Sequence, residues 1–462
     1  MDRSLAPSSQ LDQLGRGQGP DGALPSPASI AIRDATRRLQ LPRGYATRKL
    51  LEEAEKAIGM DTAPPPEVEA ELPANNRSAK HTIFQWIAAK RYPQALAAGK
   101  LLENRLQEAE TSWNLWTEIG QAFFNAEAFP YAATAYRHAI GLSDAELASW
   151  FNLGVSLQAM GQLEEALECY QQAEEISPNH PKVWCNLGAL YFQLEDFEQS
   201  VQASHRALEV RPDYARAWDN LAAALGATDQ LVDAARCCVK AIEYRPNYFE
   251  SWLKLAIIYY HAGSLPQAEK AFGEAQRIRP RSTYVQTYLA MILARTGRAF
   301  QAKEIVRRAA EIVPDPLLLW MAWMEIGRAY EKEENFPTAL ESYQQATFAN
   351  EQAHEPWLAS GRLHLRLEDR GEAMRCFNQA VTFQTDAARA WHEIGQMACQ
   401  HEDYATAAEA FRHETDLHPD DLKAWQDLAS SLEASGRGSE AAEILQRAKS
   451  LIGDQVTQTS GI

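Results

Sequence analysis

Three histidines are the first candidates for metal chemistry in this chain. His401, His413 and His418 lie near Glu402 and Asp403, and both imidazole and carboxylate groups are common metal ligands. Their spacing matches no zinc motif, and histidines on exposed helical faces explain them better. The sequence therefore predicts no metal site.

No arrangement of side chains for catalysis or cofactor binding emerges either. The segment Gly17-Gln-Gly19-Pro-Asp-Gly22 matches G-x-G-x-x-G letter for letter. It contains Pro20 and follows no strand pattern, so it does not predict a dinucleotide site. The sequence shows no Ser-His-Asp, Cys-His or paired-carboxylate arrangement. We therefore expect a protein that is not an enzyme and binds no cofactor.

The charge and the apolar runs of the chain exclude other classes. Its 462 residues include 62 acidic and 45 basic ones, and the net charge of −17 argues against binding to nucleic-acid phosphates. The longest apolar runs, such as residues 317–324, are too short to span a membrane. The first residues lack the apolar core of a signal peptide, and the six cysteines include no CxxC pair, which suggests reduced thiols. These features predict a cytoplasmic protein without membrane insertion.

Tryptophan recurs along the chain with a fixed period. Nine of the twelve tryptophans fall at intervals of 34 residues in two series: Trp116, Trp150, Trp184, Trp218 and Trp252, then Trp323, Trp357, Trp391 and Trp425. A period between 20 and 50 residues indicates a repeat protein. Within each period, apolar residues recur at spacings of three and four, which predicts two helices. Prolines such as Pro178 and Pro212 end the second helix, because proline lacks an N–H and clashes with the preceding turn.

The residues around each tryptophan form a specific motif. After Trp150 the chain has Leu153-Gly154, Leu157, Ala166, Tyr170, Ala173 and Pro178. This pattern resembles the tetratricopeptide repeat. The resemblance implies an all-α fold, a right-handed α-solenoid (superhelix) of helix-turn-helix units in which each repeat is stabilised by its neighbours.

We number each repeat so that its tryptophan is position 4. Ten repeats then cover residues 113–455 and start at 113, 147, 181, 215, 249, 283, 320, 354, 388 and 422, and a degenerate repeat covers 76–112. The repeat at 283 has Gln286 in the tryptophan slot but keeps the other motif residues. Cys169, Cys237 and Cys376 all occupy position 23, where other repeats have alanine, which predicts small core residues instead of nucleophiles.

Two features depart from the regular pattern. Three extra residues precede Trp116 and again Trp323, which indicates either two related blocks, 76–282 and 283–455, or two independent insertions. Glu414 occupies position 27, where most other repeats have alanine. A buried unpaired carboxylate is costly, so we expect looser or locally rotated packing around residues 388–421.

The ends of the chain differ from the repeats in composition. Residues 1–43 are rich in Pro, Ser and Gly and are predicted to be disordered. Residues 44–75 are predicted to contain a short helix from Tyr45 to Ile58 and a Pro-rich linker, and residues 456–462 to form a tail. The last helix, from Ser439 to about Leu451, has no further helix to cover its apolar stripe, so we expect self-association or partner docking there.

A column of asparagines is the first candidate for peptide binding. In the tetratricopeptide family, positions 2, 5, 6, 9, 12 and 13 of the first helix line the inner surface. Position 6 carries Asn152, Asn186 and Asn220 in three consecutive repeats, then Lys254 and Tyr288. The run resembles the asparagine ladder in the repeat domain of O-linked N-acetylglucosamine transferase, which holds a peptide backbone through amides. The alternative is that asparagine is simply common at this slot.

A basic stripe on the same positions of later repeats is the second candidate. Positions 9 and 13 carry Arg295, Arg328, Lys332, Arg362 and Arg366. Guanidinium groups bind carboxylates with two parallel hydrogen bonds, so we expect the stripe to bind acidic peptide segments. The alternative is that Glu325 and Glu331 neutralise it locally.

These observations predict a non-catalytic scaffold or adaptor that binds extended segments of one or more other proteins. One alternative is a regulatory or assembly subunit that holds an enzyme through its ends and outer face. Another is a protein associated with glycosyl transfer, although the repeats leave no room for a catalytic domain.

Overall fold

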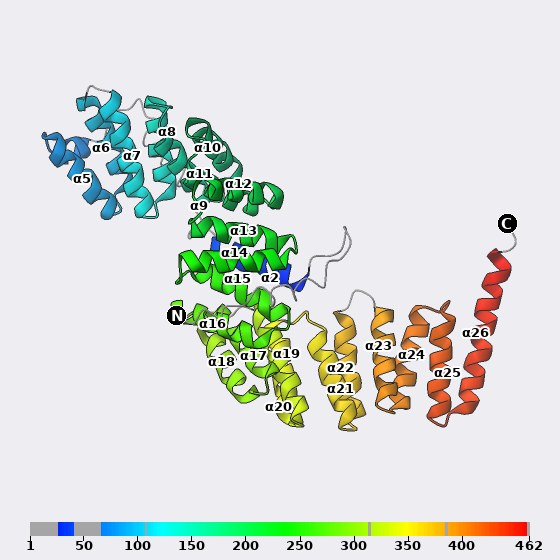
Figure 1. Ribbon diagram of the computed structural model, residues 1–462. Helices are drawn as coiled ribbons and strands as arrows, with labels where there is room; N and C mark the ends of the chain where they lie inside the picture. Colours follow the sequence, from blue (N-terminus) through cyan, green and yellow to red (C-terminus); the bar gives the residue numbers. More distant parts are fainter. Residues whose placement is uncertain (1–25, 41–65, 107–108, 313–315, 384–386, 460–462) are drawn as a thin grey trace. The chain divides into compact units, whose positions relative to one another are not determined.

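The computed structural model describes residues 26–40, 66–106, 109–312, 316–383 and 387–459 (Figure 1). Over these residues the chain forms helices and turns, with no strand. It divides into two compact parts, which we call the N-terminal module (residues 1–278) and the C-terminal module (residues 279–462).

Each repeat is a pair of antiparallel helices, and the repeats stack as an α-solenoid within each module. The first helices are α5 (Asn76–Ala88), α7 (Ala109–Asn125), α9 (Leu147–Ala159), α11 (Pro181–Gln193), α13 (Ala215–Ala227), α15 (Phe249–His261), α17 (Thr283–Arg295), α19 (Pro316–Lys332), α21 (Glu355–Arg366), α23 (Ala387–Gln400) and α25 (Leu422–Ala434). The second helices are α6 (Tyr92–Leu106), α8 (Phe129–Leu142), α10 (Leu163–Ile176), α12 (Phe197–Val210), α14 (Leu231–Tyr244), α16 (Leu265–Ile278), α18 (Ala299–Ile312), α20 (Phe336–Ala349), α22 (Arg370–Thr382), α24 (Tyr404–Leu417) and α26 (Gly438–Thr459). The helices α7 and α19 start early, in the two repeats whose tryptophan is preceded by three extra residues.

Several of the periodic tryptophans make the same hydrogen bond. The indole Nε1 of Trp184 donates to the backbone carbonyl of Pro178, 2.7 Å away, and thereby ties the end of one repeat to the first helix of the next. The same bond recurs at Trp150, Trp218, Trp252 and Trp425. Gln286 replaces the indole with its amide nitrogen, which donates to the carbonyl of Pro280 at 2.9 Å. The repeat at 283 therefore keeps the contact without the tryptophan.

Two further slots shape the helix pair. A Cβ atom at Gly154 (position 8) would lie 2.7 Å from the ring of Tyr170 (position 24), so the missing side chain lets the two helices approach. Position 15, in the turn between the two helices, has a positive φ in every repeat. This left-handed residue ends the first helix and reverses the chain. Glycine occupies the slot in some repeats and a charged residue in the others, Glu195 and Asp229 among them.

The prediction of disorder over residues 1–43 is wrong for helix α2 (Pro27–Gln40). This helix packs against α13 and α15 of the N-terminal module, and Figure 1 shows it beside them. Ala28, Ile32 and Ala35 lie on one side of α2 and are buried. The composition is Pro- and Ser-rich, but this single stripe is enough to dock the helix. The helix expected from Tyr45 to Ile58 lies outside the described residues. The next described helix is α4 (Pro66–Glu71), in the segment predicted to be a linker.

The last helix is longer than the sequence suggested. Helix α26 continues to Thr459 instead of ending near Leu451, so it includes part of the predicted tail. Ala441 and Ala448 are buried, and Ile444 packs partly against the core formed with α25. Among the described helices, none is long and apolar enough to cross a membrane.

Candidate protein-binding faces of the first helices

The first helices contact one another in series in the N-terminal module and in pairs in the C-terminal module. We call positions 2, 5, 6, 9, 12 and 13 of these helices the first-helix face. In the N-terminal module α9 contacts α11, α11 contacts α13, and α13 contacts α15; in the C-terminal module α17 contacts α19, and α21 contacts α23. Side chains from neighbouring repeats therefore meet along this face.

The asparagine column lies mostly inside the protein. Asn186 and Asn220 are only 5% and 6% exposed. Asn186 Nδ2 donates to the Tyr170 hydroxyl at 3.3 Å, and Asn220 Nδ2 donates to the backbone carbonyl of Cys185 at 2.8 Å. Asn152 is half-buried. Two of the three amide nitrogens thus already have partners within the chain.

A buried ion pair continues the column at the next repeat. Lys254, at position 6, is 1% exposed, and its Nζ lies 2.8 and 2.9 Å from the two carboxylate oxygens of Asp219. The Ser251 hydroxyl donates to the same carboxylate at 2.7 Å. Desolvating two charges is expensive, and the direct pairing with these extra bonds offsets that cost. We did not anticipate this pair from the sequence.

A sequence signal for such pairs does exist. Lys254 and Asp219 are 35 residues apart, as are Asn220 and Cys185. This distance is one period plus one residue, which brings position 6 of one repeat against position 5 of the preceding one. An acidic and a basic residue at this spacing therefore predict a contact between first helices.

The helix α2 covers the first-helix face of α13 at its C-terminal end. A Cβ atom at Gly226 (position 12) would lie 2.7 Å from Cδ1 of Ile32. The carbonyl of Ala227 (position 13) accepts hydrogen bonds from the Ser29 hydroxyl at 3.2 Å and from Arg33 Nε at 3.1 Å. This part of the face is therefore occupied by the chain itself.

The basic stripe in the C-terminal module collects around one glutamate. Glu331 accepts from Arg362 at 2.9 Å and from the Tyr343 hydroxyl at 2.8 Å, and its other oxygen lies 3.7 Å from Arg366. Arg328 pairs with Glu325 at 2.9 Å and keeps 53% of its side chain exposed. The two glutamates do pair with the stripe, as the alternative interpretation expected.

The remaining cations of the stripe lie at the surface. Arg295 and Lys332 are both exposed. The structure brings Arg362 and Arg366 together on Glu331, whereas it holds Arg328 on a separate glutamate. The stripe is therefore a set of exposed and half-exposed cations around partly neutralising acids.

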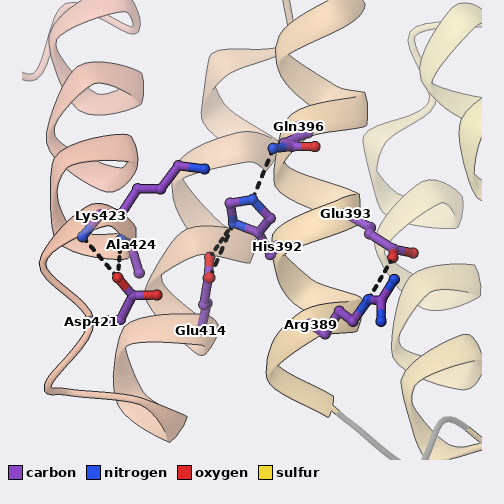
Figure 2. Close-up of polar contacts among 8 residues, drawn as sticks. All are labelled: Arg389, His392, Glu393, Gln396, Glu414, Asp421, Lys423 and Ala424. Atoms are coloured by element: carbon purple, nitrogen blue, oxygen red, sulfur yellow. Dashed lines mark hydrogen bonds and ion pairs between the residues drawn. The ribbon is translucent and has the colours of Figure 1, made fainter.

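The first-helix face of α23 is also polar (Figure 2). His392 (position 5) lies with Nδ1 3.0 Å from the carboxylate of Glu414, and Gln396 (position 9) lies 2.8 Å from His392 Nε2. With the amide donating to Nε2, the imidazole donates from Nδ1 to the carboxylate. Burial raises the pKa of Glu414 above its usual range, and the bond from His392 acts in the opposite direction.

Glu414 is not the unpaired carboxylate on which the expectation of looser packing rested. The carboxylate is buried, but His392 satisfies it, and the helices α23 and α24 pair as in the other repeats. The partner lies on the facing helix, 22 residues earlier, so position 27 considered alone does not reveal it.

The three cysteines at position 23 are buried, and His413, one of the candidate metal ligands, packs against an aromatic ring. Cys169, Cys237 and Cys376 are buried in second helices, where burial raises the pKa of Cys169 and Cys237 to about 12 and that of Cys376 to about 11. The thiolate is the nucleophile, so these thiols are poorly suited to catalysis. His413 stacks on Trp391 with ring centroids 4.4 Å apart. Within the described residues, no group of three or more His, Cys, Asp or Glu could hold a metal ion.

Family models match the repeats that the structure contains. A model described as "TPR repeat" matches residues 157–195, and models described as "Tetratricopeptide repeat" match 181–214, 237–270 and the overlapping segments 324–390, 358–414 and 392–455. Residues 157–214, 237–270 and 324–455 are therefore tetratricopeptide repeats. No curated protein matches the chain.

Several solved structures are similar at low sequence identity. They include PilF of Pseudomonas aeruginosa, at 14% identity and a TM-score of 0.43, covering 46% of this chain and 96% of that one. YrrB, described as a TPR protein with an unusual peptide-binding site, has 20% identity and a TM-score of 0.34, with 42% and 98% covered. The Cut9–Hcn1 hetero-tetramer of APC/C has 16% identity and a TM-score of 0.38, with 88% and 99% covered.

Proposed function

We propose that this protein is a non-catalytic scaffold that binds segments of other proteins on its first-helix faces. The fold supports this proposal, because stacked helix pairs present long continuous surfaces. The observation that carries it is the charged first-helix face of the C-terminal module, where Arg328, Lys332 and Arg295 are exposed. Exposed cations at regular spacing suit an extended acidic segment, because each guanidinium can take a carboxylate.

The asparagine column contributes less to this proposal. Asn186 and Asn220 are buried and already donate from their amide nitrogens, so a peptide backbone would have to displace those bonds. Asn152 is half-buried and is the member of the column best placed to contact a ligand.

A charge-reversal experiment tests the C-terminal face. The full-length chain and an Arg328→Glu/Lys332→Glu variant are titrated against a fluorescein-labelled glutamate-rich peptide, with anisotropy as the readout. We expect the variant to bind at least about tenfold more weakly, since two attractive contacts become repulsive. The matched control, Arg307→Glu/Arg308→Glu, changes two exposed cations on the second helix α18, which are 64% and 77% exposed. If both variants lost the same amount of peptide affinity, the effect would come from net charge alone, and the proposed site would be overturned.

One observation on the second helices favours the second candidate, a regulatory or assembly subunit that holds an enzyme through its ends and outer face. Position 30 carries an exposed apolar residue in three consecutive repeats: Ile176, Val210 and Tyr244 are 38%, 41% and 48% exposed. Apolar side chains repeated at one slot suit a broad docking surface. Cross-linking to a captured partner from this slot, and not from the first-helix face, would favour this second function.

A further inference from the structure

Helix α2 is held on the N-terminal module by one narrow stripe. Ala28, Ser29, Ile32, Ala35 and Thr36 are buried, and they recur at helical spacing on one side of the helix. Ile32 is the only large apolar side chain among them, and it rests against Gly226, where the absence of a side chain makes room. Ile30, on the other side of α2, is 53% exposed.

The polar contacts of α2 are made to the end of a helix. Arg33 and the Ser29 hydroxyl both donate to the carbonyl of Ala227, the last residue of α13. The carbonyls at a helix C-terminus lack intrahelical donors and carry partial negative charge, so a guanidinium there is favourable. The same guanidinium lies 4.7 Å from the ring centroid of Phe197, at the start of α12.

Two acids flank the ends of α2. Arg37 pairs with Glu195, and the Ser26 hydroxyl donates to Asp229. Glu195 and Asp229 both occupy position 15, the left-handed turn residue, in consecutive repeats. The turns that end α11 and α13 therefore present carboxylates at the two ends of a surface whose middle is apolar.

We propose that this surface is a binding site for a basic amphipathic helix, and that α2 is its displaceable resident ligand. The ligand pattern is read from α2: a small residue at 28, isoleucine at 32, alanine at 35, and arginines at 33 and 37. This inference rests on the proposed function and deepens it. It assigns the N-terminal module a basic helical ligand, in contrast to the acidic segments proposed for the C-terminal module.

The contacts of α2 are suited to exchange. The buried hydroxyl of Thr36 has no hydrogen-bond partner, which weakens the interface. The Arg37–Glu195 pair is about half-exposed on both sides, and such pairs stabilise little. A 14-residue helix is marginal by itself in water, so α2 depends on docking for its order. Covalent attachment keeps it docked by supplying an effective concentration on the order of millimolar.

A titration with α2 supplied in trans tests the site in the full-length chain. The probe is a fluorescein-labelled synthetic peptide of residues 26–40, and the readout is anisotropy. In the wild-type chain the resident α2 competes with the probe. Ile32→Glu places a charge in the apolar contact and displaces the resident helix, so this variant should bind the probe at least about tenfold more tightly than wild type. Ile30→Glu, on the exposed side of the same helix, should bind like wild type.

A second variant tests whether the probe binds at the proposed surface. Gly226→Leu, combined with Ile32→Glu, should abolish probe binding, because the new side chain fills the space that Ile32 occupies. The three atoms nearest a Cβ at Gly226 all belong to Ile32, so the repeat itself should fold normally, which circular dichroism checks.

Three results of these titrations would overturn the proposal. Equal probe affinity in the wild-type and Ile32→Glu chains would overturn the proposal, as would binding that survives Gly226→Leu. A wild-type dimer that Ile32→Glu converts to a monomer would show that α2 docks on a second copy instead of its own chain, and would overturn the cis arrangement. Because the probe is synthetic, failure here is distinct from failure to find a cellular partner or to bind acidic peptides.

Discussion

The same three slots of the first helix have opposite chemistry in the two modules. Positions 9, 12 and 13 of the repeat at 215 are Ala223, Gly226 and Ala227, and α2 lies on this end of the helix. In the repeat at 320 they are Arg328, Glu331 and Lys332, which form or adjoin partly exposed ion pairs. These three positions belong to the same helix of the repeat in both modules. The two surfaces therefore differ in the size and charge of the side chains at these positions.

The polar groups of the two modules differ in burial as well. In the N-terminal module, Lys254 and Asp219 are almost fully enclosed and satisfy each other. In the C-terminal module, Arg362 keeps 37% of its side chain exposed while it pairs with Glu331. A buried pair determines how helices pack, whereas a cation that stays partly exposed in its pair can also contact a ligand. The comparison predicts that substitutions should affect stability in the first module and binding in the second.

The largest effect should come from breaking the buried pair. Lys254→Met keeps much of the side-chain volume but leaves Asp219 charged and buried, which should lower the free energy of unfolding by about 3–5 kcal/mol. Adding Asp219→Leu should recover most of that loss, because no unpaired charge remains. Urea unfolding followed by circular dichroism measures both. The matched control is Lys240→Met, because the side chain of Lys240 is 49% exposed while it pairs with Glu243. This substitution should lower the free energy of unfolding by less than about 1 kcal/mol. Equal losses for the two lysines would contradict the burial of Lys254.

A smaller effect should follow from placing a charged residue of the C-terminal module at the equivalent position of the N-terminal module. Ala227→Lys gives position 13 the residue that the repeat at 320 has there, and it places a flexible cation beside Arg33 at the docking point of α2. We expect the backbone amides of α2 to lose protection from hydrogen exchange by about tenfold, while those of α13 and α14 keep theirs. Gln230→Lys, an exposed position three residues later, serves as the control. Protected α2 amides in Ala227→Lys would show that size and charge at this slot do not decide docking.

The helix pairs could be predicted from the sequence because their determinants are local and periodic. The indole of Trp150 donates a hydrogen bond to a carbonyl six residues earlier. Gly154 has no side chain, so the ring of Tyr170 can pack directly against its backbone. Every such contact lies within one period or across one repeat junction. The fold therefore follows from residues that are close in sequence.

The occupied site could not be predicted in the same way. The stripe of α2 has one large apolar residue, Ile32, and its acceptor at Ala227 lies nearly two hundred residues further on. Composition over a window favoured disorder, because it averages over the few residues that dock. The pair of Asp219 and Lys254 was missed for a different reason: each residue alone is ordinary, and only their spacing of 35 reveals the contact.

The smallest effect should be a pH dependence confined to the C-terminal module. Folding raises the pKa of Glu414, chiefly because the carboxyl group is buried. At a pH between the usual glutamate pKa and the raised one, the folded chain therefore keeps a proton on Glu414 that the unfolded chain has released. The contribution of Glu414 to stability is therefore largest below the usual pKa and falls as pH rises through the raised one. Glu414→Gln removes the titration while keeping an acceptor for His392, so its melting temperature relative to wild type should increase with pH across this window. Glu409→Gln, on the same helix and exposed, should show no such trend. If the difference between Glu414→Gln and wild type were flat or reversed with pH, the bond from His392 would outweigh burial at this site, and the carboxylate would be as well accommodated as the pair in the N-terminal module.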